Sequence, residues 1–254
     1  MEGRVVVVTG GAGGIGAAVC RSLAAGKTAV AVDLDAGGLD SLVRDTEGMG
    51  GGSVTAYVAD VSAGGAAEAV LGQVESELGP VGALVNVAGV LRRGPAALCS
   101  LEDWSALLAV NATAVFLWSA AAARRMAGRP GASIVTVASN AVGVPRVGMA
   151  AYAASKAAAV AFTLGLGLES AAHGVRCNVV CPGSTDTPML AAMGPDAAAG
   201  AVAGDAAAFR AGIPLGRVAA PQDVADAVVF LLSEQARPIT MHSLYVDGGA
   251  ALRG

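Results

Sequence analysis

Tyr152 and Lys156 lie four residues apart, and Ser139 lies thirteen residues before the tyrosine. Four residues are about one helical turn, so a helix here places the phenol and the ammonium group on one face. A phenol is a poor base because its ordinary pKa is about 10, and a nearby positive charge favours the phenolate. A serine hydroxyl can hold the oxygen of a reacting alcohol or ketone. These side chains therefore predict proton transfer during the oxidation of an alcohol.

A glycine-rich segment near the N-terminus reads Thr-Gly-Gly-Ala-Gly-Gly-Ile-Gly over residues 9–16, directly after a run of valines. Glycines let the backbone turn tightly and approach a pyrophosphate, and the free N–H groups at the start of the next helix can bind its charge. In this strand–loop–helix context, the pattern predicts a dinucleotide site. Its expected members are Thr9, Gly10, Gly14, Ile15 and Gly16.

Asp33 ends the next apolar run, 23 residues after Gly10. A carboxylate at this place can accept hydrogen bonds from both hydroxyls of an adenosine ribose, and it would repel a 2′-phosphate. No Arg or Lys occurs in the glycine segment or immediately after Asp33. The sequence therefore favours NAD over NADP as the cofactor.

Two later segments are placed to complete the cofactor site. Asp60 and Val61 follow the third apolar run and are expected beside the adenine. Asn86, Ala88 and Gly89 follow the fourth run, where a glycine allows a close approach to the cofactor.

Apolar runs and helical patterns alternate along the whole chain. Continuous runs of Val, Ile and Ala, rather than alternating patterns, indicate strands that are buried on both faces of a parallel sheet. The predicted strands are 5–8, 29–32, 54–58, 83–86, 133–138, 176–180 and 243–246, and the predicted helices are 14–25, 38–46, 66–78, 102–127, 150–172 and 221–232. We therefore predict an α/β fold over residues 1–254, with a single Rossmann-type domain. Its doubly wound, parallel, seven-stranded sheet has helices on both faces.

This organisation divides the expected roles along the chain. Residues from 1 to about 130 form the cofactor half, and residues from about 131 to 254 form the catalytic and substrate half. Residues 187–213, rich in Ala, Gly and Pro, follow the sixth strand at the edge of the sheet where ligands bind. They are either a mobile lid over the catalytic pocket or an irregular surface excursion, and the sequence favours neither.

Composition restricts the possible partners. The net charge of −4 argues against nucleic acid or an anionic membrane. Apolar residues make up 54% of the chain and charged residues 14%, so other subunits are expected to cover part of the surface. Four cysteines without framework spacing and two histidines form no metal-ligand pattern, which predicts reduced thiols and no metal.

Residues 104–123 carry no charge and are long enough to span a bilayer. Many alanines and several polar residues favour a helix in the core or at a subunit interface instead. The start of the chain lacks the pattern of a signal peptide. We therefore expect a soluble, cytoplasmic protein.

Together these residues resemble the short-chain dehydrogenase/reductase family, over essentially the whole chain. The resemblance is carried, in the family's order, by Thr9-Gly-x-x-x-Gly-Ile-Gly16, Asn86-x-Ala-Gly89, Asn111, Ser139, Tyr152-x-x-x-Lys156, Pro182-Gly183 and Asp247-Gly-Gly249. It implies that Tyr152 is the catalytic acid/base and that Ser139 positions the substrate oxygen. It also implies that Asn111 maintains a water-linked proton relay, and that Lys156 lowers the pKa of Tyr152 and binds the nicotinamide ribose.

The resemblance extends to further contacts and to assembly. It implies that Pro182, Gly183 and Thr187 contact the cofactor, Thr187 at the nicotinamide carboxamide. It also implies a homotetramer in which helices 102–127 and 150–172 form the subunit interface, although the sequence leaves a dimer open.

A narrower resemblance, to family members that oxidise dihydro-hydroxybenzoic acids, is carried by segments beside the expected substrate pocket. These segments are 137–140, 144–149, 174–180, 182–187 and 239–242, together with Leu91 and Arg92. The implied reaction converts 2,3-dihydro-2,3-dihydroxybenzoate to the catechol acid used in siderophores. Such a substrate needs a cation for its carboxylate, with Arg146 the first candidate and Arg92 the second. Met149 and Leu190 are expected at the same pocket.

Three alternatives remain open. Pro188 and Leu190 depart from the pattern of this subgroup, so a 2-amino substrate, trans-2,3-dihydro-3-hydroxyanthranilate, is possible in an antibiotic pathway. A reductase of ketones or 3-oxoacyl thioesters is the second alternative, and Asp33 argues against it. An NAD-sensing scaffold protein without turnover is the third, and the intact catalytic residues argue against it.

Overall fold

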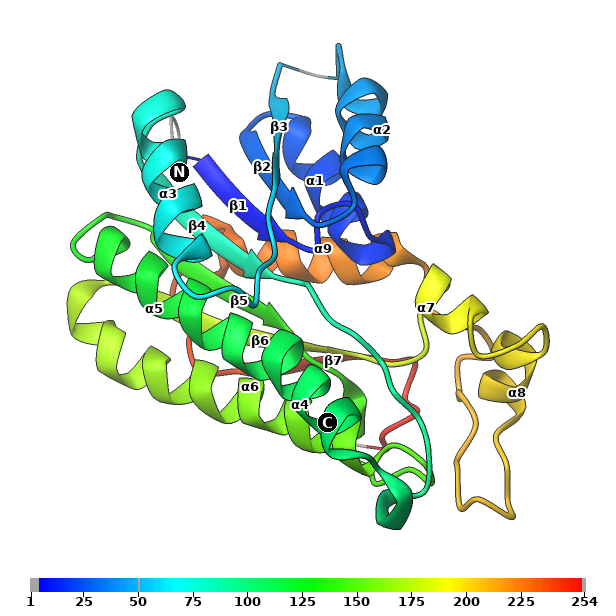
Figure 1. Cartoon of the computed structure of the whole chain (residues 1–254). Helices are drawn as coiled ribbons and strands as arrows, with labels where there is room; N and C mark the ends of the chain where they lie inside the picture. The colour runs from blue at the N-terminus through cyan, green and yellow to red at the C-terminus, as the bar shows by residue number, and fades with distance from the viewer. Residues whose placement is uncertain (1–4, 50, 253–254) are drawn as a thin grey trace.

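Seven strands pair in parallel in the order β3-β2-β1-β4-β5-β6-β7. The computed structural model describes residues 5–49 and 51–252 (Figure 1). The strands are β1 Val5–Thr9, β2 Thr28–Asp33, β3 Ser53–Val58, β4 Val81–Asn86, β5 Ser133–Val137, β6 Arg176–Pro182 and β7 Ser243–Val246. This confirms the predicted α/β class, the seven strands and their parallel arrangement. The strand ends differ from the prediction by at most two residues.

The central strands are apolar throughout because both faces of the sheet are covered. Every residue of β1 is buried. Its side chains point alternately to the two faces: Val6 and Val8 belong to one core cluster, and Val5 and Val7 belong to another. A polar residue in the middle of this strand would therefore be buried whichever face it pointed to.

Helices cover the two faces in two layers, as Figure 1 shows. One layer contains α1 Gly14–Ala24, α2 Ala36–Thr46 and α9 Pro221–Leu232. The other contains α3 Ala66–Glu77, α4 Leu101–Leu108, α5 Ala114–Met126 and α6 Ala150–Ser170. Short 3₁₀ turns occur at Ala96–Leu98, Asn140–Val142, Ala171–His173 and Glu234–Ala236.

The order of the strands reverses direction between β1 and β4, and the loops that follow these two strands diverge there. Gly10 N donates to Val32 O (2.8 Å), and the N–H groups of Val87 and Ala88 both donate to Thr9 O (3.1 Å each). The glycine segment and the loop after β4 are thus held side by side. In open parallel sheets, ligands bind at this switch point, beyond the carboxyl ends of the strands.

The predicted helix 102–127 is wrong in one respect, because a π-helical turn at Ala109–Thr113 separates α4 from α5. Asn111 lies in this turn and is fully buried. Its side-chain Nδ2 donates to Val90 O (2.9 Å), and its Oδ1 accepts from Val90 N (2.9 Å). These bonds give the irregular turn a position beside the loop after β4. Single π turns inside α-helices occur frequently at functional sites.

Two helical stretches, Leu101–Met126 and Ala150–His173, are apolar and long enough to cross a bilayer by length and composition alone. In their most apolar windows 44% and 33% of the residues are buried. Both stretches lie against the sheet in Figure 1, so the buried part of each belongs to the core. Core helices of this length pass the same test, so it is weak evidence for a membrane span.

The segment predicted as a lid or a surface excursion contains two short helices, α7 Pro188–Ala191 and α8 Ala197–Ala203. A tight turn follows, in which Asp205 and Arg210 pair antiparallel. In Figure 1 this segment lies beyond the carboxyl ends of the strands, to one side of the sheet. We refer to residues 187–213 as the lid because of their position, and their motion stays a prediction.

Candidate active site

Two connected cavities lie at the carboxyl edge of the sheet. The cofactor cleft, of about 320 Å³, follows the glycine segment and the ends of β2, β3 and β4. The substrate cavity, of about 230 Å³, lies between the loop after β5, the start of α6 and the lid. Both are lined by a shared set of residues: Ile15, Val87, Gly89, Thr187 and Met189. A ligand in the cleft can therefore present its end to the cavity.

The glycine segment is shaped for a phosphate group. The first turn of α1 has no side-chain cap and no acidic residue, so its N–H groups face the cleft without a side-chain acceptor. Gly10 has φ +71°, and a Cβ there would lie 2.6 Å from Ala88 N. A Cβ at Gly14 would lie 2.7 Å from Thr187 Cγ2. Only glycine permits these approaches.

The adenosine end of the cleft is acidic. Asp33 lines it, with Oδ2 accepting from Ala12 N (3.1 Å) and Oδ1 accepting from Asp35 N (3.2 Å). These two bonds fix the carboxylate across the mouth of the glycine segment. Asp60 and Val61 also line the cleft. The donors and acceptors of this cleft therefore match a dinucleotide, with the pyrophosphate at α1 and the ribose at Asp33.

Two residues predicted as cofactor contacts do not line either cavity. Thr9 is buried, and its Oγ1 accepts from Val87 N (3.3 Å). Asn86 is also buried, and its Nδ2 donates to Ser119 Oγ (2.8 Å) and Thr136 Oγ1 (3.2 Å). Both side chains therefore have structural roles: Thr9 holds the start of the loop after β4, and Asn86 connects the end of β4 to α5 and β5. The remaining predicted contacts line one cavity or both: Gly10, Gly14, Ile15, Gly16, Asp33, Asp60, Val61, Ala88, Gly89, Pro182, Gly183 and Thr187.

Tyr152, Ser139 and Lys156 come together in the wall of the substrate cavity. Tyr152 and Lys156 lie on consecutive turns of α6, as their spacing predicted. Lys156 Nζ donates to Val137 O (3.0 Å), and burial lowers the pKa of Lys156 to about 8. A Cβ at Gly89 would lie 3.1 Å from this Nζ, so the ammonium group also borders the cofactor cleft.

Three influences act on the pKa of Tyr152. Burial raises the pKa of Tyr152, whereas a hydrogen bond with Ser139 and the positive charge of Arg146 lower it. Arg146 is thus one cation that acts on the phenol, while Lys156 bonds to the backbone of β5. The effect of Lys156 on the pKa of Tyr152 stays a prediction. Sequence spacing placed Lys156 on the predicted helix, but it did not reveal that Arg146 also acts on Tyr152.

Asn111 connects three parts of the site. Besides its two bonds with Val90, its Nδ2 donates to Ser155 Oγ (3.0 Å), which in turn donates to Tyr152 O (2.8 Å). These contacts join the π turn to the loop after β4 and to the first turns of α6. The observed contacts give Asn111 a positioning role, and the water-linked relay stays a prediction.

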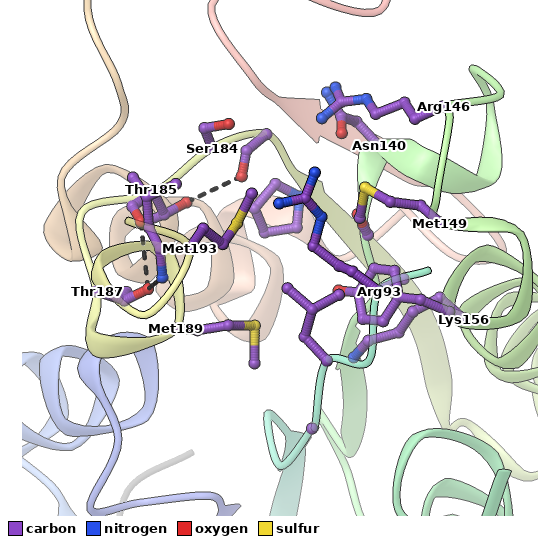
Figure 2. Close-up of a pocket in the computed structure, with 18 of the residues that line it drawn as sticks. Arg93, Asn140, Arg146, Met149, Lys156, Ser184, Thr185, Thr187, Met189 and Met193 are labelled. Atoms are coloured by element: carbon purple, nitrogen blue, oxygen red, sulfur yellow. Dashed lines mark hydrogen bonds between the residues drawn. The ribbon is translucent and has the colours of Figure 1, made fainter. Parts of the chain in front are cut away.

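The substrate side of the cavity contains three of the four residues predicted for it, namely Arg146, Met149 and Leu190. Arg92, the second candidate for the carboxylate, is not among its lining residues. Its Nε lies 3.3 Å from Asp103 Oδ1, on the exposed surface. The next residue, Arg93, lines the cavity instead, because successive side chains in an extended loop point in different directions. Figure 2 shows Arg93 in the middle of the pocket and Arg146 beside Asn140.

The lid supplies residues that the sequence pattern did not reveal. Met189, Met193 and Arg210 all line the cavity. Figure 2 shows Met189 and Met193 on the side of the pocket opposite Met149 and Lys156. The sequence leaves open whether this segment covers the pocket or is a surface excursion, and no periodicity within it indicates which side chains point inward. Methionine side chains adapt to irregular shapes, so these walls suit an apolar ring.

This fold and site define an oxidoreductase with a nicotinamide cofactor. A family model described as short chain dehydrogenase matches residues 4–198, and the chain belongs to this family. It is 48% identical over 255 residues, 99% of this chain and 97% of the relative, to 2,3-dihydro-2,3-dihydroxybenzoate dehydrogenase of Bacillus subtilis. It is 38% identical to the vibriobactin-specific 2,3-dihydro-2,3-dihydroxybenzoate dehydrogenase of Vibrio cholerae, over 97% of this chain and 95% of the relative.

A solved structure shows the same architecture. A short chain dehydrogenase from Burkholderia cenocepacia, crystallised in complex with NADP, has a TM-score of 0.86 and 36% identity. The match covers 98% of each chain. The chain is thus a dehydrogenase of this family, and the nicotinamide cofactor agrees with the shape of the cleft.

Proposed function

We propose that this enzyme uses NAD⁺ to oxidise 2,3-dihydro-2,3-dihydroxybenzoate to 2,3-dihydroxybenzoate. The observation that carries the proposal is that Arg146 and Tyr152 line one cavity and that the charge of Arg146 acts on the phenol. An acid–base group beside a guanidinium suits a ring alcohol that also bears a carboxylate. The names of the Bacillus and Vibrio relatives support the same substrate class.

The residues of the cavity divide the chemistry between them. Bound NAD⁺ would supply the hydride acceptor. Ser139 holds the C3 hydroxyl of the substrate by a hydrogen bond, and Tyr152 takes the proton of this hydroxyl as the C3 hydride leaves. The ring ketone that results then shifts the C2 proton to its oxygen, which makes the ring aromatic and draws the reaction forward.

Tyr152 must be deprotonated to act as the base in this direction. Burial opposes deprotonation, and the hydrogen bond with Ser139 and the charge of Arg146 favour it. The ammonium group of Lys156 lines the same cavity and carries a positive charge below its pKa of about 8. We therefore propose that the phenol, rather than a carboxylate or histidine, is the base.

We propose NAD⁺ rather than NADP⁺ as the cofactor because of Asp33. Its carboxylate is fixed by Ala12 N and Asp35 N at the end of the cleft where a ribose would bind. A 2′-phosphate there would meet a negative charge at short range, which costs affinity. The residues just after Asp33 include no Arg or Lys that could neutralise it.

The position of Leu190 is compatible with a second substrate, a 2-amino dihydro acid. Leu190 is 7% exposed and lines the cavity, so it forms part of an apolar wall that faces the substrate. A 2-amino dihydro acid keeps the carboxylate and the C3 hydroxyl, and it is the alternative substrate. Both acids yield an aromatic product by the same steps.

The proposal includes the setting of the enzyme. The product is a catechol acid of the kind used in siderophores, and the name of the Vibrio relative is consistent with that use.

All four cysteines are unpaired thiols, as a reducing cytoplasm would keep them. We further propose a homotetramer, formed in part by the outer faces of α5 and α6.

A spectroscopic assay tests the proposed reaction. Purified enzyme is incubated with each dihydro acid and with NAD⁺ or NADP⁺, and formation of the reduced nicotinamide is followed at 340 nm, the usual absorbance band. We expect rapid reduction of NAD⁺ with the 2,3-dihydroxy acid and slower reduction of NADP⁺. Tyr152→Phe should lower turnover by about 10²–10⁴-fold, the usual contribution of a general base. Binding of NAD⁺ should change by less than about threefold, because the hydroxyl lies on the substrate side.

Two results would contradict the proposal. Turnover of neither dihydro acid, with clear activity on a 3-oxoacyl thioester, would replace it with the reductase alternative. Appreciable turnover by Tyr152→Phe would show that another group removes the proton.

A further inference from the structure

The substrate cavity carries an excess of positive charge. Its charged lining residues are Arg93, Arg146, Lys156, Arg210 and Asp205. The single carboxylate among them is already used, since Asp205 Oδ1 accepts from Ala207 N (3.0 Å) and from Ala208 N (3.2 Å) to close the turn of the lid. A cavity of this kind selects an anionic ligand.

The guanidinium groups around this cavity make no close ion pair in the described part of the chain, although Asp247 and Asp205 exert a smaller attraction on Arg146 and Arg210. Within residues 5–49 and 51–252, none of the ion pairs includes Arg93, Arg146 or Arg210. Burial and then the positive charge of Arg210 lower the pKa of Arg146. Burial and then the positive charge of Arg93 lower the pKa of Arg210. Arg210 is therefore close enough to Arg146 and to Arg93 for repulsion in each pair, and an anion beside Arg210 would relieve it.

The lid backbone holds Arg210 in this position. Asp205 N donates to Arg210 O (2.9 Å) and Arg210 N donates to Asp205 O (2.8 Å), so the residue ends a closed turn. Gly204, with φ +77°, packs against the same turn, and a Cβ there would lie 2.7 Å from Arg210 O. The side-chain Nη2 of Arg210 donates to Ser184 Oγ (3.3 Å), on the loop after β6. One side chain thus links the lid to the wall of the cavity.

We propose that Arg210 is a specificity residue carried by the lid, which binds the carboxylate of a ring acid together with Arg146. The acid then connects the lid to the loop before α6, so that an anionic ring holds the lid over the cavity and a neutral ring does not. A carboxylate can accept from two guanidinium groups at once, because its two oxygens offer about four acceptor positions. The inference takes the identity of the acid from the proposed function, but the selection by charge is independent of it.

A comparison of an acid with its neutral counterpart tests this role. The affinities of 2,3-dihydroxybenzoate and 2,3-dihydroxybenzamide for the NAD⁺-saturated enzyme are measured by calorimetry. Wild-type enzyme should prefer the acid, and Arg210→Gln should reduce that preference by about 10–100-fold, the value of a hydrogen bond to a charged group. Affinity for the amide should stay within about threefold, because the ring contacts are unchanged. Arg210→Lys should restore part of the preference.

A matched control removes the same charge elsewhere. Arg44 is exposed at the end of α2, away from both cavities. Arg44→Gln should leave the preference for the acid unchanged. An equal loss of preference in Arg44→Gln and Arg210→Gln would overturn the inference, because net charge rather than position would then explain it. An unchanged preference in Arg210→Gln would overturn it directly.

Proteolysis tests whether the acid holds the lid. Phe209, beside Arg210, is 91% exposed, which offers a chymotrypsin site at the tip of the turn. The acid should slow cleavage there at least fivefold in wild-type enzyme, and the amide should not. In Arg210→Gln the acid should lose this effect. Equal protection by acid and amide would show that the lid does not respond to the carboxylate.

The two proposals can fail separately. If the enzyme oxidises the dihydro acid but Arg210→Gln keeps the preference for acid over amide, the reaction stands and the role of Arg210 is wrong. If the preference depends on Arg210 but no dihydro acid is oxidised, the site binds a different ring acid.

Discussion

Lys156 illustrates how much a buried charge depends on its surroundings. It is 5% exposed, and its Nζ donates to Val137 O at the end of β5. Burial lowers its pKa from 10.5 to about 8, because the charged form loses hydration that one carbonyl does not replace. Near pH 8, the charged and neutral forms of the Lys156 side chain are therefore present in similar amounts. The same burial that positions Lys156 beside the cofactor cleft makes its charge sensitive to pH.

This shift predicts a pH-dependent difference in stability between the wild-type enzyme and Lys156→Met. Between pH 8 and pH 10.5, the unfolded chain binds more protons at this residue than the folded chain does. The free energy of unfolding of the wild type should therefore rise relative to the variant as the pH increases. The rise is at most about 1.4 kcal/mol per pH unit, and the advantage is lost as the pH falls through 8. Urea unfolding at pH 7.5, 8.5 and 9.5 measures it, and a constant difference would contradict the shift.

At the scale of elements, the cofactor cleft depends on how closely the glycine segment packs against itself. A Cβ at Gly16 would overlap the carbonyl oxygen of Gly10 and lie 2.8 Å from its carbon. A Cβ at Gly13 would find its nearest neighbour, the same oxygen, at 3.6 Å. Packing within the loop therefore requires glycine at position 16 but not at position 13. Gly16 lets α1 begin directly against the loop, whereas Gly13 leaves room on the side of the cleft.

Alanine substitutions at the two positions test this difference. Gly16→Ala should lower the free energy of unfolding by about 1–3 kcal/mol, the usual cost of overpacking a close contact. Gly13→Ala should change it by less than about 0.5 kcal/mol, because its backbone is extended (φ −80°, ψ 163°) and the space is open. Urea unfolding without cofactor measures both. Equal values for the two variants would mean that the loop adapts more readily than its contacts indicate.

At the scale of the whole molecule, one face of the helical layer remains apolar and exposed. The exposed residues of α6 include a stripe of small side chains that repeats every three or four positions, namely Ala154, Ala157, Ala158, Ala161 and Gly165. On the neighbouring α5, Phe116 is 48% exposed and makes an edge-to-face contact with Phe162 at 5.5 Å between ring centroids. Small residues let helices of another subunit approach closely, and aromatic rings add buried area.

Disruption of this face should reduce the mass of the assembly. Ala158→Arg introduces a charged side chain in the middle of the stripe, where it would be buried without a partner. We expect light scattering to give about four times the 24.5 kDa chain mass for the wild type. For the variant, we expect about half of that mass or less. Ala69→Arg, exposed on α3, is the control and should assemble like the wild type. A variant that still forms the wild-type assembly would place the interface elsewhere.

Local patterns in the sequence were enough to predict the strands, most of the long helices and the succession of these elements along the chain. A buried strand needs apolar residues on both faces, and a helix repeats its face every turn, so neighbours in sequence determine these elements. The placement of Tyr152 and Lys156 on consecutive turns was predictable for the same reason, because both lie on one helix. The glycine segment was predictable because its conformation is also local.

Contacts between distant segments were decided only by the tertiary structure. Arg93 rather than Arg92 enters the cavity, and Arg210 comes to it from the lid, because the direction of a side chain in a loop depends on what packs around that loop. Asn86 turns into the core for the same reason, since Ser119 and Thr136 meet it only after the sheet has formed. The spacing of residues along the chain carries no information on such contacts. They form when loops that are far apart in the sequence lie at the same edge of the sheet.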